Sequence, residues 1–150
     1  VSEYKYRIEE TVADIEKYLR RIDYTIRKKG REIILEENIT IPQFHALQIL
    51  IHHGKLTIGD LSQKMSLACS TITDLIDRME KTQLVARKRS EKDKRVVIVE
   101  VRPKGHEILE KVLIKRREYL RGKISHYKLE EMENLRRELQ ILYESIGSDD

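Results

Sequence analysis

The chain has 150 residues, 39% of them hydrophobic and 37% charged, which suits one ordinary domain and argues against two large independent ones. Its 30 basic and 26 acidic residues leave a net charge of only +4, so an anionic partner must be inferred from where the charges lie. One cysteine excludes an intramolecular disulfide framework, and no apolar stretch is long enough to span a bilayer. We therefore expect a cytoplasmic protein without contact to a membrane.

The first segment predicts a long amphipathic helix. Its apolar residues recur in steps of three and four along one face, at Tyr4, Ile8, Val12, Ile15, Leu19, Ile22 and Ile26. We expect this helix to close near Gly30, and a further turn or two of helix to follow at residues 33–35 before Asn38.

A capping pattern marks the start of the next helix. Thr40 can cap with its hydroxyl, Gln43 can reach back to the Thr40 amide, and Pro42 is tolerated in a first turn, where amide groups have no helical partner. This helix is expected to run to about His53, because Gly54 is typical of a position just beyond a helix end.

Two short helices then follow one another closely. Thr57 offers a cap for the first, with Asp60 favoured near the positive end of the helix dipole. After a turn near residues 66 and 67, residues 68–81 predict a second helix with an apolar stripe beside a polar face. Two such helices joined by a tight turn indicate a helix-turn-helix, whose second helix is the candidate DNA reader.

The periodicity changes after Leu84. Residues 85–88 and 96–101 are strand-like, and a highly charged hairpin loop separates them. Pro103 precedes a further amphipathic helix, and a last one carries apolar residues from Leu129 to Ile146 at helical spacing. A β-hairpin with a basic tip after two short helices is typical of a winged helix-turn-helix.

The predicted fold class is mainly α (α+β), a winged helix-turn-helix with N- and C-terminal helices that form a dimerisation region. We treat residues 1–150 as a single domain, with dimerisation helices at 1–37 and 104–148 and the DNA-binding region at 40–102. Apolar stripes at both ends of so short a chain favour a core shared by two copies over packing within one copy. Coiled-coil dimerisation without DNA is the remaining alternative.

The start of the reader helix carries short hydroxyl side chains, namely Ser70, Thr71 and Thr73. They can approach phosphates or base edges in a major groove, and the helix N-terminus itself favours a nearby phosphate. Capping alone is the competing explanation for any one of them. Arg78 and Lys81, further along the helix, can reach the DNA backbone.

The hairpin loop at residues 87–95 concentrates positive charge, and we expect it to contact DNA. Its basic residues are Arg87, Lys88, Arg89, Lys92, Lys94 and Arg95. Arg95 suits insertion into a minor groove, whereas the lysines suit contact with phosphates. Asp93 would repel phosphate if it were free, so we expect it to pair with a nearby arginine and orient the wing. The alternative is a solvated charged turn without a partner.

Together these residues resemble the MarR family, regulators named for multiple antibiotic resistance. The resemblance covers nearly the whole chain and rests on Ile41-Pro42-Gln43-Phe44, Thr57-Ile58-Gly59-Asp60-Leu61, Ser70-Thr71-Ile72-Thr73 through Met79-Glu80-Lys81, and Asp93-Lys94-Arg95 before Val96. It implies a triangular homodimer with interlocked terminal helices, whose two reader lobes meet successive major grooves of a pseudo-palindromic operator. It also implies that the protein is a repressor, released when a small ligand changes the distance between those lobes.

Two positions depart from the family pattern. Gln83 stands where a glycine is common after the reader helix, which puts the local turn in question. Lys94 replaces the first arginine of the usual Asp-Arg-Arg wing signature, so charge is kept while bidentate geometry is lost, and we expect altered affinity rather than lost binding.

Other residues suggest sensing roles that we consider and set aside. Cys69 could be a redox switch, but peroxide-sensing relatives carry their reactive cysteine in the first helix, where this chain has none. His45 resembles a ligand position in zinc-responsive relatives, but matching downstream histidines are missing, so we expect no metal site. Tyr18, Tyr24 and Phe44 could line an effector cleft, although aromatic residues at helical spacing more often belong to a core.

The chain shows no nucleophile and base at recognisable spacing and no glycine-rich loop for phosphates, so we expect no enzyme, no catalytic residues and no cofactor. The sequence predicts a transcriptional regulator that is a homodimer, binds double-stranded DNA sequence-specifically, and responds to a small-molecule effector of unknown identity. A constitutive or architectural DNA-binding protein without effector sensing is the alternative, and weak sequence preference would distinguish it.

Overall fold

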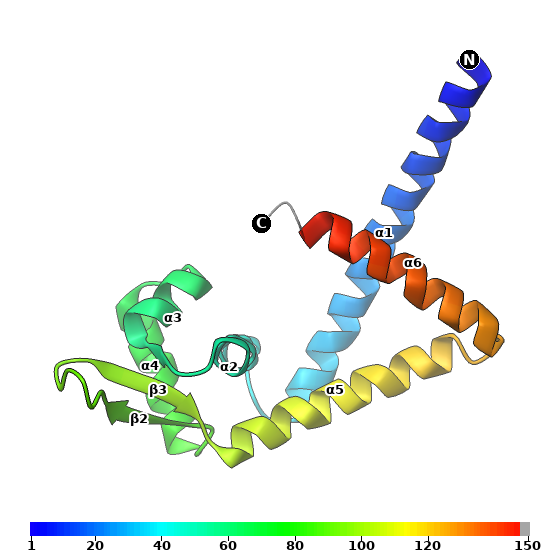
Figure 1. The fold of residues 1–150 in the computed structure, drawn as a ribbon. Helices are drawn as coiled ribbons and strands as arrows, with labels where there is room; N and C mark the ends of the chain where they lie inside the picture. Colours follow the sequence, from blue (N-terminus) through cyan, green and yellow to red (C-terminus); the bar gives the residue numbers. More distant parts are fainter. Residues whose placement is uncertain (148–150) are drawn as a thin grey trace. The chain divides into compact units, whose positions relative to one another are not determined.

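The computed structural model describes residues 1–147, which form mostly helices together with one small antiparallel sheet (Figure 1). In chain order the elements are α1 (Ser2–Glu36), α2 (Ile41–His53), β1 (Leu56–Thr57), α3 (Ile58–Met65), α4 (Cys69–Lys81), β2 (Val85–Arg89), β3 (Val97–Val101), α5 (Pro103–Lys123) and α6 (Leu129–Gly147). The predicted fold class, a mainly helical winged helix-turn-helix, is confirmed.

The chain divides into two compact units, Val1–Ile114 and the remainder from Lys115 onwards. The helix-turn-helix, the sheet and α1 belong to the first unit, and α6 belongs to the second. Ser148, the last residue of the predicted range 104–148, lies outside the described residues. Among residues 1–147, no helix combines the length and the apolar character that crossing a membrane requires.

Helix α1 runs without interruption through Gly30 and ends at Glu36, so the predicted close near Gly30 is wrong. Glycine inside a helix costs only about 0.5–1 kcal/mol relative to alanine. The last helical turns after Gly30 are stabilised by Ile33 and Ile34, whose side chains are buried. Burial of two large side chains outweighs the glycine penalty.

Both predicted capping patterns are present. At α2, the Gln43 amide donates to the Thr40 hydroxyl at 3.2 Å, and the Thr40 amide donates to Oε1 of Gln43 at 3.0 Å. At α3, Thr57 and Asp60 form the same reciprocal pair at 3.0 and 3.3 Å. Each pair satisfies amide groups that a helix start leaves without partners, so these starts are determined locally.

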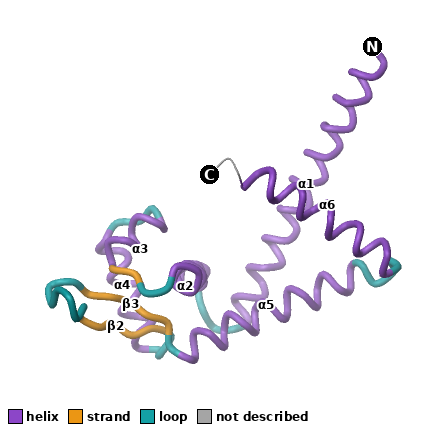
Figure 2. Tube along the Cα trace, in the orientation of Figure 1, coloured by secondary structure: helices purple, strands orange, loops and turns teal. Residues whose placement is uncertain are grey.

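The sheet has the order β1-β3-β2, with antiparallel pairing throughout, and Figure 2 shows its strands in orange. The two-residue strand β1 was not predicted; it places Leu56 opposite Val99. Strand β2 extends to Arg89, which lies opposite Val97. The predicted strand at residues 85–88 is therefore present and one residue longer, so residues 87–89, which the sequence analysis also counted with the hairpin loop, belong to the strand.

The core of the first unit joins α2, α3, α4 and the sheet. The largest of its fully buried side chains are Leu47, Leu50, Leu61, Ile72, Ile76, Met79, Leu84, Val85, Val99 and Val112. Because α4 and both long strands contribute to this one core, the reader helix and the base of the wing are held against each other by apolar packing.

Candidate nucleic-acid interface

The reader helix α4 has one buried side and one polar side. Ile72, Ile76 and Met79 are completely buried and turn the helix toward the core. Four of the five predicted DNA contacts on this helix are exposed, namely Ser70, Thr71, Arg78 and Lys81. The first two lie in the first turn, where unpaired backbone amides and the helix dipole favour an anion.

Thr73, the fifth predicted contact, is half-buried. Its hydroxyl donates to the carbonyl of Cys69 at 2.9 Å, so the donor is used within the helix. Thr73 lies beside a groove of about 410 Å³ between α4 and the wing; the groove is lined by Ile58, Thr73, Arg87, Lys88, Arg89 and Val97. The groove brings one reader residue and the three basic residues of β2 together.

Arg87 faces the reader helix rather than solvent. Its guanidinium Nη2 lies 2.6 Å from Oδ1 of Asp77 and 3.2 Å from Oε1 of Glu80, both on α4. The Arg87 side chain is 32% exposed, and hydrogen bonding to Glu80 raises its pKa. Both carboxylates contact this guanidinium, so Arg87 has intramolecular partners at the position where the sequence analysis predicted a DNA contact.

Lys88 points to the opposite face of the sheet, as strand alternation requires. It forms an ion pair with Glu100 on β3, and Lys55 contacts the other carboxylate oxygen at 3.4 Å. Hydrogen bonds from these two lysines, chiefly Lys88, hold the pKa of Glu100 below its usual value. Lys88 still exposes 66% of its side chain, so it adds positive potential to the outer face of the wing.

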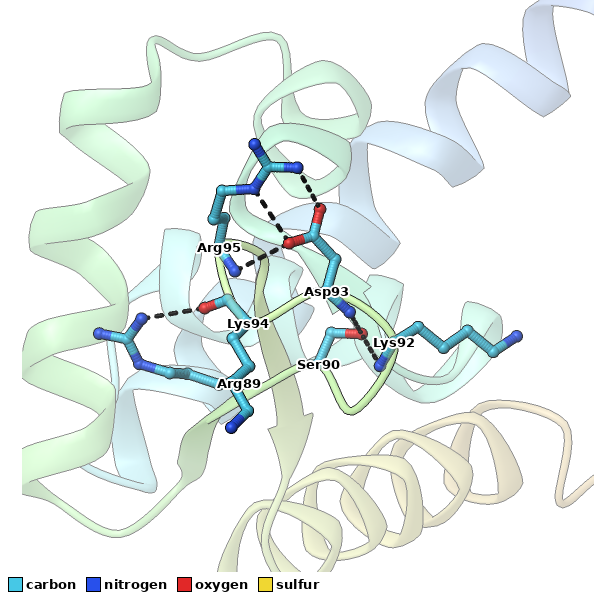
Figure 3. A network of polar contacts seen from close by, with 6 residues as sticks. All are labelled: Arg89, Ser90, Lys92, Asp93, Lys94 and Arg95. Atoms are coloured by element: carbon cyan, nitrogen blue, oxygen red, sulfur yellow. Dashed lines mark hydrogen bonds and ion pairs between the residues drawn. The ribbon is translucent and has the colours of Figure 1, made fainter.

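The tip of the wing is organised by hydrogen bonds within the loop (Figure 3). The hydroxyl of Ser90 accepts from the amides of Lys92, at 3.2 Å, and Asp93, at 3.5 Å. Arg89 donates through Nη1 to the carbonyl of Lys94 at 2.9 Å. These contacts hold the loop closed and leave the ammonium groups of Lys92 and Lys94 exposed.

Asp93 and Arg95 form a bidentate pair at the tip. Oδ1 of Asp93 accepts from Nε of Arg95 at 3.2 Å, and Oδ2 accepts from Nη2 at 3.3 Å (Figure 3). The Arg95 amide also donates to Oδ1 at 3.0 Å, and these bonds lower the pKa of Asp93. The expected pairing of Asp93 with an arginine is therefore present, and it leaves the Arg95 side chain 91% exposed.

The turn after α4 leads into β2 and is hydrogen-bonded to the start of α5. Gln83 has φ = 66°, the left-handed conformation that favours glycine, which explains why this position stood out in the sequence. Lys104 donates to the carbonyl of Thr82 at 2.9 Å, and the Arg102 amide donates to the carbonyl of Leu84 at 2.9 Å. The first turn of α5 is thus bonded to the turn that ends the reader helix.

Sequence reasoning missed the acidic partners Asp77 and Glu80. A signal existed, because residues 73, 77 and 80 share one flank of a helix at spacings of four and three. Nothing in the sequence pointed this flank toward β2 rather than solvent. The aromatic residues also separate: Phe44 is in the core, whereas Tyr18 and Tyr24, for which a core position was favoured, are exposed. Cys69, the first residue of α4, is exposed and free.

A reader helix with a polar outer side, followed by a hairpin with exposed cations at its tip, defines a winged helix-turn-helix protein. Comparison with known proteins agrees with this class. Residues 39–97 match the model of the MarR family. A MarR family protein from Bacillus stearothermophilus has the same fold with a TM-score of 0.79 and 45% identity, over 93% of this chain and 97% of that one.

Two relatives from Bacillus subtilis (strain 168) are similar over most of their length. The HTH-type transcriptional regulator YsmB is 52% identical over 82% of this chain and 84% of its own. The HTH-type transcriptional repressor MdtR is 27% identical over 83% of this chain and 80% of its own. The chain belongs to the MarR family and is a transcriptional regulator.

Proposed function

We propose that this regulator binds double-stranded DNA as a homodimer and reads a pseudo-palindromic operator with α4 and the wing. The observation that carries the proposal is the set of exposed hydroxyls and cations on α4 and the wing tip. The half-buried Thr73 lies beside the groove between α4 and the wing. In the proposal, Ser70, Thr71 and Thr73 meet base edges or phosphates in the major groove. Arg78 and Lys81 contact the adjacent backbone.

The wing supplies the second set of contacts. Arg95 enters the minor groove, because its guanidinium is exposed and is pre-oriented by Asp93. Lys92 and Lys94 lie on either side of Asp93 and contact phosphates, while Lys88 and Arg89 add positive potential nearby. We leave Arg87 out of the contact set, since two carboxylates hold it.

Exposed apolar side chains at both ends of the chain support the homodimer. The stripe on α1 that the periodicity predicted is exposed throughout, and Ile15 on it is 49% exposed. Helix α6 has no buried residue and exposes Leu139, Ile141, Tyr143 and Ile146. Apolar faces of this extent are typical of surfaces that a second copy covers. Residues 1–37 and 104–148 are our proposed dimerisation helices, and 40–102 the DNA-binding region, within one functional domain.

We further propose that the protein represses transcription and that a small-molecule effector releases it from DNA. The relative MdtR is named a repressor, which supports repression here. A small molecule that binds one separation of the two reader lobes better than another would release the DNA. The proposal assigns no catalytic activity, in keeping with relatives that are transcriptional regulators, and it sets the protein in the cytoplasm, where a bacterial-type operator is found.

The test is selection of bound sequences from a random duplex-DNA pool, with wild type and Arg95→Ala in parallel at near-physiological salt. We expect an inverted repeat with half-sites about one helical turn apart, and weaker enrichment by the variant. Changes at Thr71 or Thr73 should alter base preference more than folding. A folded protein that binds no duplex would overturn the proposal.

The alternative is a constitutive or architectural DNA-binding protein. It would enrich no sequence, yet it would bind bulk DNA with a steep salt dependence. It would also show no effector that alters operator affinity while the protein stays folded.

A further inference from the structure

Strand β2 is an edge strand, and one of its outward amides is bonded to the reader helix. In the order β1-β3-β2, β3 is the one strand among residues 1–147 that pairs with β2. The amide of Arg87 therefore finds its partner outside the sheet: it donates to Oε2 of Glu80 at 2.9 Å. An edge amide that is bonded to a side chain of another element ties the strand to that element.

The Arg87 side chain also binds the reader helix. Its Nη2 lies 3.2 Å from Oε1 of the same Glu80 and 2.6 Å from Oδ1 of Asp77. Glu80 thus uses both carboxylate oxygens on one residue of the wing. Hydrogen bonds from the Arg87 amide, and then from its guanidinium, hold the pKa of Glu80 below its usual value, in agreement with this geometry.

The contact lies where it can determine the angle of the wing. Val85, two residues before Arg87, is buried in the core, so the base of β2 is fixed there. Beyond Arg87 the strand has only Lys88 and Arg89, and the tip loop with Arg95 follows. Asp77 and Glu80 share the α4 flank of Thr73. Thr73 and Arg87 both line the groove between α4 and the wing. A small rotation at Arg87 would therefore move the whole tip.

We propose that Asp77, Glu80 and Arg87 act as positioning residues that set the wing at the angle needed for α4 and Arg95 to contact DNA together. This inference rests on the proposed function. It carries an unusual consequence, since Glu80 and Asp77 then strengthen DNA binding although their charge repels phosphate. A direct phosphate contact by Arg87 has the opposite consequence, because removal of either carboxylate would free the guanidinium for DNA.

The direction in which Glu80→Gln changes the operator affinity distinguishes these two roles. Glu80→Gln keeps the shape of the side chain and removes its charge. Glu91→Gln makes the same change on the exposed wing loop, where no ion-pair partner is found among the described residues. We expect Glu80→Gln to weaken binding of the selected operator by about fivefold, as the loss of a partly exposed charged contact suggests. Glu91→Gln should leave binding unchanged or tighten it by up to about twofold.

A second comparison shows whether the effect acts through the wing. In an Arg95→Ala background the tip contributes less, so Glu80→Gln should cost less than about twofold. Arg87→Lys keeps the charge but cannot reproduce the planar fork, and it should recover only part of the affinity that Arg87→Gln loses. A change that merely destabilised the fold would instead lower affinity equally in both backgrounds and lower the melting temperature.

Hydrogen exchange of the Arg87 amide provides a measurement independent of DNA. Glu80→Gln should speed this exchange, because a neutral amide accepts the hydrogen bond less strongly than a carboxylate. Faster exchange together with weaker operator binding supports the inference. Faster exchange with unchanged or tighter binding overturns it while the proposed function stands. If wild-type protein binds neither the selected operator nor a mixed-sequence duplex, the proposed function fails and the positioning role falls with it.

Discussion

The helix-turn-helix lobe, made of α3 and α4, and the first part of α1 are similarly rich in apolar side chains, yet they use them differently. In the lobe, residues such as Leu61, Ile72 and Ile76 are completely buried within one chain. Along α1, residues at equally regular spacing, such as Ile15 and Ile22, are about half exposed, at 49% and 54%. A periodic apolar stripe predicts a helix and its face, but it does not say what covers that face.

The same substitution in the two regions gives the largest expected contrast. Ile76→Ala should lower the free energy of unfolding by about 3 kcal/mol, because it leaves a cavity in a closed core. Ile15→Ala should instead weaken dimer association by about tenfold, since Ile15 has no core of its own. Denaturant unfolding measures the first and sedimentation equilibrium the second. Unchanged association in Ile15→Ala would mean that this face of α1 is not the dimer interface.

Replacing the buried Gly105 and replacing Gly30 on α1 should change the stability in opposite directions, by smaller amounts. A Cβ at Gly105 would lie 2.6 Å from the carbonyl oxygen of Leu84 and 2.6 Å from Cγ1 of Val101. Gly105→Ala should therefore destabilise the protein by about 2 kcal/mol through overpacking. Gly30 on α1 has nothing within 4 Å of such a Cβ, so Gly30→Ala should stabilise by about 0.5–1 kcal/mol. Thermal unfolding of both variants measures these changes. A lower stability of Gly30→Ala would contradict the expectation, because it would mean that the added methyl group meets a steric clash.

The turn after the reader helix offers a stabilising change. Gln83 adopts φ = 66°, where glycine avoids a steric cost, so Gln83→Gly should raise the free energy of unfolding by about 0.5 kcal/mol. The neighbouring Thr82 has φ = −92° and caps α4, so Thr82→Gly should lower it. Denaturant unfolding of the two variants compares them, and a loss in Gln83→Gly would show that its side chain contributes contacts of its own.

The smallest expected effect is the loss at acid pH of the contribution that Glu80 makes to the free energy of unfolding. Bonds from Arg87 hold the pKa of Glu80 below its ordinary value of 4.5, so its contribution to stability is fully present above pH 4.5. The contribution is lost as pH falls through the lowered pKa of the folded state. Because the Glu80 side chain is 38% exposed, we expect at most about 0.5 kcal/mol. Unfolding of wild type and Glu80→Gln between pH 7 and pH 3 measures it, and a gap that stays constant with pH contradicts the assignment.

Local patterns made much of the fold predictable. The reciprocal caps at Thr40 and Thr57 lie within four residues of chain, so their sequence signal is complete. Asp93 and Arg95 are also close neighbours, which is why their pairing could be expected. The end of α1 was missed because burial of Ile33 and Ile34, and not Gly30, decides it.

By itself, the sequence determined the order of the helices and the two longer strands, the reader helix, the basic wing and the family, since each depends on periodicity, capping or motif spacing over a few residues. Only the tertiary structure decided which basic residues face another element and which are exposed. It turned Arg87 toward Asp77 and Glu80 while it left Lys92, Lys94 and Arg95 exposed at the tip. Glu80 and Arg87 come from different elements, and their contact follows from the packing of β2 against α4, which no local pattern records.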